Sequence, residues 1–336
     1  MQFGIIGSGS WATAIAKILT DGGNNIYWYF RNEKVISHVT QRKHNPQYLS
    51  QVYFNTNQLT LSSSVATVAK ACDVIIIAVP SAFVEAVLND LPEDTFKGKK
   101  IISAVKGILP GSNQLVNEYL AEKYKVAVED YFTILGPCHA EEVAAEKLSY
   151  LTFSGKSEQE TSSIAQYFKT CYINVITNTD IIGVQYAAVL KNIYALGAGI
   201  AHGLEYGDNF LSVYIANCAR ELAVFSKKLM WEEDCTDEQN LVNYATSVYL
   251  GDLLVTCYSL YSRNRTFGNM IGKGYSVKAA QLEMNMVAEG YNASKCIYKT
   301  NKKVNAEIPI VDTIYKILWE HLPPDEGFKK LEGVLM

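Results

Sequence analysis

The segment that most constrains the fold is Gly7–Ala12, with the sequence GSGSWA. It follows an apolar run at 2–6 and precedes a stretch in which apolar residues have helical spacing. Gly7 permits a tight turn, Gly9 lets a phosphate group approach the backbone, and Ala12 leaves room for a helix to pack on the strand. The unpaired N–H groups that open such a helix bind anions. The segment therefore predicts a strand–turn–helix unit that binds a dinucleotide, the alternative being a turn that is merely tight.

Strands and helices are expected to alternate through the first half of the chain. Apolar runs without strict alternation are typical of strands buried on both faces, and helices between them imply right-handed crossovers and a parallel sheet. The expected strands are 2–6, 25–30, 73–79, 100–105, 131–135, 150–154 and 173–177, with helices at 11–21, 64–71 and 82–90.

From about Asn178 the pattern is helical, and a chain of 336 residues exceeds the usual size of one core. We therefore expect a dinucleotide-binding domain at 1–178 and a substrate and catalytic domain at 179–336. The expected fold class is α/β: an N-terminal doubly wound sheet of the Rossmann type plus an all-helical C-terminal domain, with a small-molecule cleft between them. The expected helices of the second domain are 181–204, 209–230, 238–248, 277–288, 290–303 and 309–320.

The longest apolar segment is Asp180–Leu204, which is typical of one helix with Asp180 as its N-cap. Lys191 and Asn192 lie in its middle, where an ammonium group meets an anion, loses its proton or reaches water. A lysine pKa is normally ~10.4, and desolvation lowers it toward the range of neutral acid–base chemistry. Two other interpretations stay open, a lysine on an exposed polar stripe and a membrane span. The span is disfavoured by polar residues at helical intervals, namely Gln185, Lys191, Asn192 and His202.

Composition excludes several classes of function. A net charge of −4 argues against broad binding of nucleic acid or of an anionic membrane, so we expect no nucleic-acid partner and no stable membrane insertion. The 7 cysteines are scattered, without a CxxC pair or zinc-like histidine spacing, so we expect reduced thiols, no metal and a cytoplasmic location. The strand expected at 2–6 leaves no room for a secretory signal before it.

Charged residues follow two expected strands at the rim where a ligand binds in such sheets. Arg31 stands where NAD-restricted sites have an acidic residue, with Glu33 two positions later. A guanidinium can grip a 2′-phosphate, which predicts that NADP(H) is accepted. Alternatively, Arg31 stacks on the adenine or is solvated. Lys106 follows the strand at 100–105 and can face an anionic substrate.

Three further segments carry polar groups. Gly136 and Pro137 bend the chain before an expected helix start that includes Cys138 and His139. Asp252 lies in an apolar setting, LGDL. The run 262–268, SRNRTFG, suits a phosphate because arginine, amide and hydroxyl groups satisfy its oxygens; a solvated basic loop and a single-strand nucleic-acid contact are the alternatives.

Together these motifs resemble those of bacterial NAD(P)-dependent glycerol-3-phosphate dehydrogenases. The matching segments occur in the family's order: GSGSWATA, AVPS, AVKG, GPCHAEE, VLKNIYALGAG, LGDLLVTC, SRNRTFG and VAEGY. They run from Gly4 to about Trp319, and the combination of the Lys-Asn helix with GDL and SRNR is specific to the family. Cys138, His139 and Tyr249 depart from its usual residues, which puts the substrate contacts and the loop before Asp252 in doubt.

The resemblance implies a cytoplasmic enzyme, commonly a homodimer, that uses NADP(H) and/or NAD(H) to reduce dihydroxyacetone phosphate to glycerol-3-phosphate for phospholipid synthesis. It implies that Lys191 is the catalytic acid–base, that Asp252 supports it, and that Lys106 touches both substrate and cofactor. Implied cofactor contacts are Gly7, Gly9, Ser10, Trp11, Arg31, Lys106, Ala140, Arg263, Val287 and Glu289, and implied substrate contacts are Lys106, Gly136, Cys138, Lys191, Asp252, Ser262, Arg263 and Asn264. The rivals are a β-hydroxyacid-type dehydrogenase acting on a carboxylate and a non-catalytic dinucleotide sensor.

Overall fold

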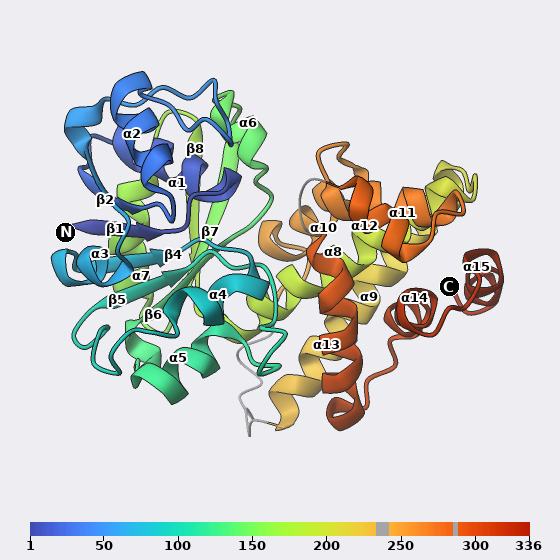
Figure 1. Cartoon of the computed structure of the whole chain (residues 1–336). Helices are drawn as coiled ribbons and strands as arrows, with labels where there is room; N and C mark the ends of the chain where they lie inside the picture. Colours follow the sequence, from blue (N-terminus) through green and yellow to red (C-terminus); the bar gives the residue numbers. More distant parts are fainter. Residues whose placement is uncertain (233–241, 285–287) are drawn as a thin grey trace. The chain divides into compact units, whose positions relative to one another are not determined.

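The computed structural model describes residues 1–232, 242–284 and 288–336. The chain divides into two compact units, Met1–Ile181 and Ile182–Met336. Figure 1 colours the first unit from blue to green and the second from yellow-green to red. The two units are described separately below.

The first unit is built on one eight-stranded sheet with the order β3-β2-β1-β4-β5-β6-β7-β8 (Figure 1). The strands are β1 (Phe3–Ile6), β2 (Ile26–Tyr29), β3 (Leu59–Ser62), β4 (Val74–Ile77), β5 (Lys100–Ser103), β6 (Tyr131–Leu135), β7 (Ser149–Gly155) and β8 (Ile173–Asn178). The expected doubly wound sheet is confirmed, but it is not parallel throughout, because β7 runs antiparallel to β6. The short connection between β6 and β7 stays at one end of the sheet, so no crossover is needed.

Helices separate most of these strands. They are α1 (Ser10–Asp21), α2 (Glu33–Arg42), α3 (Val65–Ala71), α4 (Ser81–Leu88), α5 (Val116–Tyr124), α6 (Ala140–Ala144) and α7 (Glu158–Ala165), with short 3-10 turns η1 (Thr56–Gln58), η2 (Val128–Asp130) and η3 (Gln166–Phe168). β1 and β4 are buried at every position, which explains their unbroken apolar sequence. β1 lies between β2 and β4, so the direction of winding reverses at β1 and places the ligand crevice beyond its carboxyl end.

Among its described residues, the second unit consists of helices and their connections and contains no strand, as expected. Its helices are α8 (Ile181–Gly203), α9 (Asp208–Glu232), a π-helix η4 (Ser247–Gly251), α10 (Asp252–Tyr258), α11 (Arg263–Gly272), α12 (Val277–Glu283), α13 (Glu289–Val304), α14 (Pro309–Trp319) and α15 (Pro324–Glu332). The helix expected at 238–248 is wrong for 242–246, which form turns, while 238–241 lie outside the described residues.

Helix α8 is a core helix. By length and composition it could cross a membrane, yet 94% of its most apolar window is buried within the molecule. Lys191 and Asn192 are 2% and 5% exposed, so the interpretation of Lys191 as a residue on an exposed stripe is wrong.

Helices α8 and α11 touch through their backbones. A Cβ atom on Gly268 would lie 1.9 Å from the carbonyl oxygen of Leu196, and one on Gly199 would lie 2.0 Å from that of Arg265. No side chain fits at either distance, so glycine is required on both helices. This close approach brings the first turn of α11 beside the middle of α8, where Lys191 lies.

Candidate active site

The glycine turn has the shape that a pyrophosphate requires. Gly7 has φ +128°, and a Cβ atom there would lie 2.3 Å from the carbonyl oxygen of Ala78, so the turn itself demands glycine. A Cβ atom on Gly9 would meet no protein atom within 4 Å. The protein therefore does not explain glycine at that position, whereas the close approach of a phosphate does. These residues fit a bound dinucleotide.

Beside this turn lie the first residues of α1 and the lysine that follows β5. Ser10 begins α1 directly after the turn. The unpaired N–H groups of the first turn of this helix therefore lie beside the glycine turn. The Lys106 Nζ atom lies 5.1 Å from the centroid of the Trp11 ring, close enough for a cation–π contact. Sequence reasoning singled out Trp11 and Lys106 separately, and the structure brings them together.

Arg31 is exposed and follows β2. The next residue, Asn32, caps α2 by accepting a hydrogen bond from the Lys34 N–H at 2.9 Å. The Glu33 carboxylate accepts a hydrogen bond from the Ser63 hydroxyl. Both Arg31 and Glu33 are expected near an adenosine ribose. Glu33 is hydrogen-bonded within the protein, whereas Arg31 is exposed to solvent.

The turn after β6 is also tight. Gly136 has φ +123°, and a Cβ atom there would lie 3.0 Å from the carbonyl oxygen of Tyr150. Cys138 is 5% exposed and packs in the core of the unit, and His139 and Ala140 lie at the start of α6. The burial of Cys138 suits a backbone contact better than chemistry at its thiol.

In the second unit, Lys191 and Asp252 form an ion pair whose side chains are 3% and 2% exposed. Asp252 begins α10 directly after the π-helix that contains Tyr249, so the residue that departs from the family's usual one lies in a π turn that leads into the site. The Thr256 hydroxyl donates to the Asp252 carbonyl at 2.6 Å and approaches its carboxylate at 3.4 Å. A buried ammonium is tolerated because a carboxylate compensates its charge.

Asn264 joins three helices beside this pair. Its amide Nδ2 donates to Asn192 Oδ1 at 2.9 Å, and its Oδ1 accepts a hydrogen bond from the Gly290 N–H at 2.9 Å. A Cβ atom on Gly290 would lie 2.4 Å from the Asn192 carbonyl oxygen, so α13 approaches α8 closely here. The amide of Asn264 thus has a structural role, besides any contact with substrate, that the sequence did not reveal.

The segment 262–268 is not a solvated loop, so that alternative is wrong. Ser262 is the N-cap of α11, with its hydroxyl accepting from the Arg265 N–H at 3.3 Å, and both Ser262 and Asn264 are buried. Arg263 is the exposed first residue of the helix. Glu289 is the first residue of α13. Val287, expected to contact the cofactor, lies outside the described residues.

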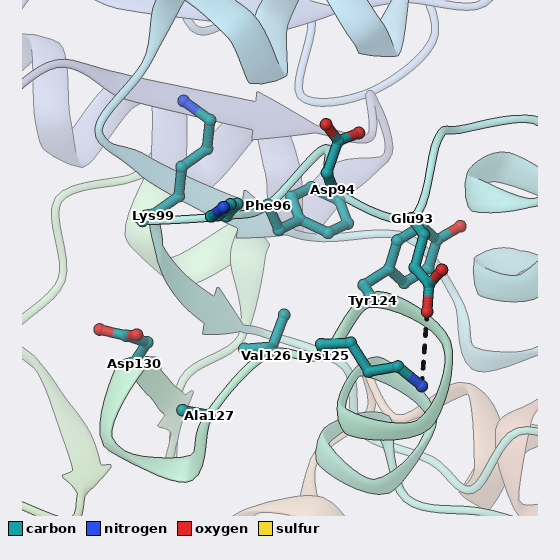
Figure 2. Close-up of a pocket in the computed structure, with 11 residues that line it drawn as sticks. Glu93, Asp94, Phe96, Lys99, Tyr124, Lys125, Val126, Ala127 and Asp130 are labelled. Carbon is teal, nitrogen blue, oxygen red and sulfur yellow. Dashed lines mark ion pairs between the residues drawn. The ribbon is translucent and has the colours of Figure 1, made fainter.

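One open hollow lies elsewhere in the first unit, with a volume of about 480 Å³. It is lined by residues that precede β5 and β6, and thus lies at the amino ends of these strands, opposite the glycine turn. Figure 2 shows Lys125 turned toward Glu93, with which it forms an ion pair at 3.4 Å. Ligands of doubly wound sheets bind at the carboxyl ends, so this hollow is separate from the candidate dinucleotide site.

A doubly wound sheet whose glycine turn fits a dinucleotide, in one chain with a helical unit that buries a lysine–carboxylate pair, is typical of the class of nicotinamide-dependent dehydrogenases. Within that class, the chain belongs to the NAD-dependent glycerol-3-phosphate dehydrogenase family. The family's N-terminal model matches residues 2–161, and its C-terminal model matches residues 180–329.

Individual relatives agree with this assignment. The chain is 31% identical to glycerol-3-phosphate dehydrogenase [NAD(P)+] of Staphylococcus saprophyticus over 98% of this chain and 97% of the relative. It is 34% identical to the Bacillus subtilis protein of the same name, over 94% and 89%. The solved glycerol-3-phosphate dehydrogenase of Coxiella burnetii superposes with a TM-score of 0.87 at 25% identity, covering 98% of both chains.

Proposed function

We propose that this protein catalyses the NAD(P)H-dependent reduction of dihydroxyacetone phosphate to glycerol-3-phosphate, reversibly. The observation that carries the proposal is the buried Lys191–Asp252 ion pair on the family's Lys-Asn helix. A lysine shielded from water beside one carboxylate is a group that can hold and release a single proton. Supply of glycerol-3-phosphate for phospholipid synthesis is the corresponding role in the cell.

The first unit is assigned to the cofactor. The turn at Gly7 and Gly9, with the N–H groups of Ser10 and Trp11, would hold the pyrophosphate of the nicotinamide dinucleotide, which supplies hydride when bound. Arg31 would contact a 2′-phosphate, which favours use of NADPH as well as NADH. Ala140, together with Arg263, Val287 and Glu289 of the second unit, would complete the proposed cofactor contacts.

The second unit is assigned to proton transfer. As the ammonium, Lys191 donates a proton to the alkoxide that develops as the ketone is reduced, and as the amine it accepts that proton in the reverse direction. Asp252 orients Lys191 and balances its charge while the proton is present. Because both side chains are buried, bulk water does not compete for that proton.

The substrate phosphate is assigned to the start of α11. Ser262, Arg263 and Asn264 lie at the N-terminal end of a ten-residue helix, where the helix dipole and N–H groups favour an anion. Lys106 would add a second positive charge, and Gly136 and Cys138 would border the substrate through their backbones. Holding the phosphate at fixed points orients the ketone for reduction, which raises the rate of that step.

A homodimer and a cytoplasmic location complete the proposal. The side chains of Leu254, Tyr258, Leu260 and Tyr261 are exposed around the end of α10, and a subunit contact would cover apolar surface of this kind. The six described cysteines form no disulfide bond, as in a reducing compartment. Light scattering after size exclusion tests the dimer.

The activity is tested by following NADPH and NADH absorbance with dihydroxyacetone phosphate and, separately, with a β-keto acid. We expect oxidation with the phosphate substrate, and Lys191→Ala should lower kcat by about 100-fold or more. Lys17→Ala is the matched control, because Lys17 is also a buried lysine in ion pairs, with Asp21 at 2.7 Å and Glu146 at 2.9 Å, but belongs to α1 of the first unit.

Each result has a consequence. Oxidation only with the keto acid would identify a carboxylate-directed dehydrogenase, and oxidation with neither substrate would favour a dinucleotide sensor. A Lys191→Ala enzyme that works at the wild-type rate would remove Lys191 from the mechanism while leaving the activity intact.

A further inference from the structure

Three side chains hold the three successive carbonyl groups of the glycine turn. The Trp28 Nε1–H donates to the Gly7 carbonyl at 2.7 Å, and the Asn45 Nδ2–H donates to the Ser8 carbonyl at 3.0 Å. The Thr13 hydroxyl donates to the Gly9 carbonyl at 2.9 Å. Trp28 comes from β2, Asn45 from the loop between α2 and η1, and Thr13 from α1. The turn is thus fixed from three separate elements.

This arrangement determines where the N–H groups point. In a trans peptide the carbonyl and the following N–H point in opposite directions. Because the carbonyls of Gly7, Ser8 and Gly9 are drawn toward the protein, the N–H groups of Ser8, Gly9 and Ser10 are turned away from it. Within the described residues, no hydrogen bond has any of these three N–H groups as its donor. They are oriented to receive an anion.

We propose that Asn45 is a positioning residue for dinucleotide binding, which orients the glycine turn by holding the Ser8 carbonyl. This inference rests on the proposed function, since it assumes that the turn holds a pyrophosphate. It assigns a binding role to a residue 37 positions from its partner in the sequence. In this proposal Asn45, which is buried, acts through its hydrogen bonds to Ser8 and Thr13 and makes no contact of its own with the cofactor.

The side chain of Asn45 is suited to this role because its hydrogen-bonding groups are all used. Asn45 is 1% exposed. Its amide also donates to Thr13 Oγ1 at 2.9 Å, and its Oδ1 accepts from the Gln47 N–H at 3.0 Å. The Asn45 amide thus links the Ser8 carbonyl to the hydroxyl that holds the Gly9 carbonyl. An aspartate has the same shape but, when ionised, cannot donate to either oxygen.

The loop that carries Asn45 is itself well anchored. The Phe54 N–H donates to the Lys43 carbonyl at 2.7 Å, which closes the loop. Phe54 is buried, with its ring centroid 5.3 Å from that of Trp28. The loop and Trp28 therefore support each other and both reach the turn, so that Asn45 presents its amide in a fixed position.

The test measures NADPH binding directly, by titration calorimetry, in wild-type protein and in Asn45→Ala and Asn45→Asp. We expect the Kd for NADPH to rise about tenfold in both variants, because both lose the buried hydrogen bond that holds the Ser8 carbonyl. At saturating NADPH, kcat and the KM for dihydroxyacetone phosphate should stay within twofold of wild type. Thr13→Val should weaken binding similarly, and Thr13→Ser, which keeps the hydroxyl, should restore it.

Gln58→Ala is the matched control. Gln58 lies at the end of the same loop region and donates its side-chain amide to the Thr20 carbonyl at 3.0 Å, near the opposite end of α1 from the glycine turn. The chemistry of the bond is the same, but it does not reach the turn. Its loss should leave the Kd for NADPH within twofold of wild type.

Two results would overturn the inference: Asn45 variants that bind NADPH as tightly as wild type, or a Gln58→Ala protein that loses as much affinity as they do. A wild-type protein that binds no dinucleotide would overturn both this inference and the proposed function. If the variants bind NADPH in the expected order of affinity but the wild-type protein does not reduce dihydroxyacetone phosphate, only the proposed function is overturned.

Discussion

Glu221 of α9 makes the stability of the protein depend on pH in an unusual direction. Its side chain is buried, with the residue 2% exposed. One carboxylate oxygen accepts from the Ile310 N–H at 2.6 Å, and the other lies 3.4 Å from both the Val311 N and the Tyr194 hydroxyl. Burial raises the pKa of Glu221 to about 8, the nearby Asp312 charge also raises it, and the donated hydrogen bonds only partly oppose the rise.

The sign and size of the effect follow from proton linkage. A glutamate in the unfolded chain has a pKa of about 4.3. Between that value and about 8, folded Glu221 keeps a proton that the unfolded chain has lost. The neutral form therefore stabilises the fold fully below pH ~4, and this contribution falls by about 1.4 kcal/mol per pH unit as pH rises through the window. From pH 5 to 7.5 the loss is about 3 kcal/mol.

Glu221→Gln removes this dependence while keeping a similar shape. The amide oxygen can still accept from the Ile310 N–H, and an amide has no proton to lose in this range. The free energy of unfolding of Glu221→Gln minus that of wild type should therefore increase with pH, by about 3 kcal/mol between pH 5 and 7.5. Urea unfolding at half-unit steps of pH measures this difference. Glu129→Gln, at an exposed carboxylate, is the control for the substitution itself.

A difference that stays flat across this range would refute the assignment of a buried, protonated carboxyl. A difference that decreases as pH rises would mean that the backbone N–H groups at the start of α14 outweigh burial and keep Glu221 charged.

Three further changes test other parts of the structure. Arg31→Ala should raise the KM for NADPH about tenfold with little change for NADH, because a guanidinium–phosphate contact is lost; an unchanged NADPH/NADH ratio in steady-state kinetics would exclude that contact. Asp252→Asn should lower the free energy of unfolding by about 3–5 kcal/mol, because it leaves the buried charge of Lys191 uncompensated. Adding Lys191→Met should recover most of that stability, since an apolar side chain at this position costs less than an unpaired charge. Equal stability of the single and double variants in urea would contradict this reasoning. Gly268→Ala should cost about 3 kcal/mol because its Cβ atom would meet a carbonyl of α8 at 1.9 Å. Gly207→Ala, where a Cβ atom meets nothing within 4 Å, should cost no more than about 1 kcal/mol in thermal unfolding, because the position precedes α9 and alanine caps a helix less well than glycine.

The parts of the fold that were predicted have local causes. β1 and β4 are buried on both faces and have unbroken apolar sequences, so they were recognised as strands. β3 was missed because Leu59–Ser62 alternates apolar and polar residues over only four positions, as befits an edge strand that is partly exposed. The antiparallel direction of β7 was missed for a different reason: strand direction depends on the connection and leaves no mark in the strand's own residues.

The chemistry of the site was predicted less completely than its members. Lys191 was singled out because a charge in an apolar helix is unusual, but its partner in the ion pair lies on another helix, which no spacing rule reveals. Asn264 was interpreted through its neighbours in SRNR as a phosphate contact. The structure adds that its amide donates a hydrogen bond to Asn192 and accepts one from the Gly290 N–H. Substitution of Asn264 therefore disturbs the contact of three helices as well as any bound phosphate.

The glycine turn shows the limit of motif reasoning most clearly. What the motif encodes is intrinsic to its residues: a positive φ at Gly7 and an absent side chain at Gly9. The orientation of the turn is not intrinsic, because it depends on hydrogen bonds from Trp28 and Asn45, which are 21 and 37 residues from their partners. Two chains with the same glycine pattern can therefore differ in affinity for a dinucleotide, since binding requires N–H groups that are already aligned before the ligand arrives. The affinity of such a turn for a dinucleotide is therefore determined by the surrounding elements as much as by the motif.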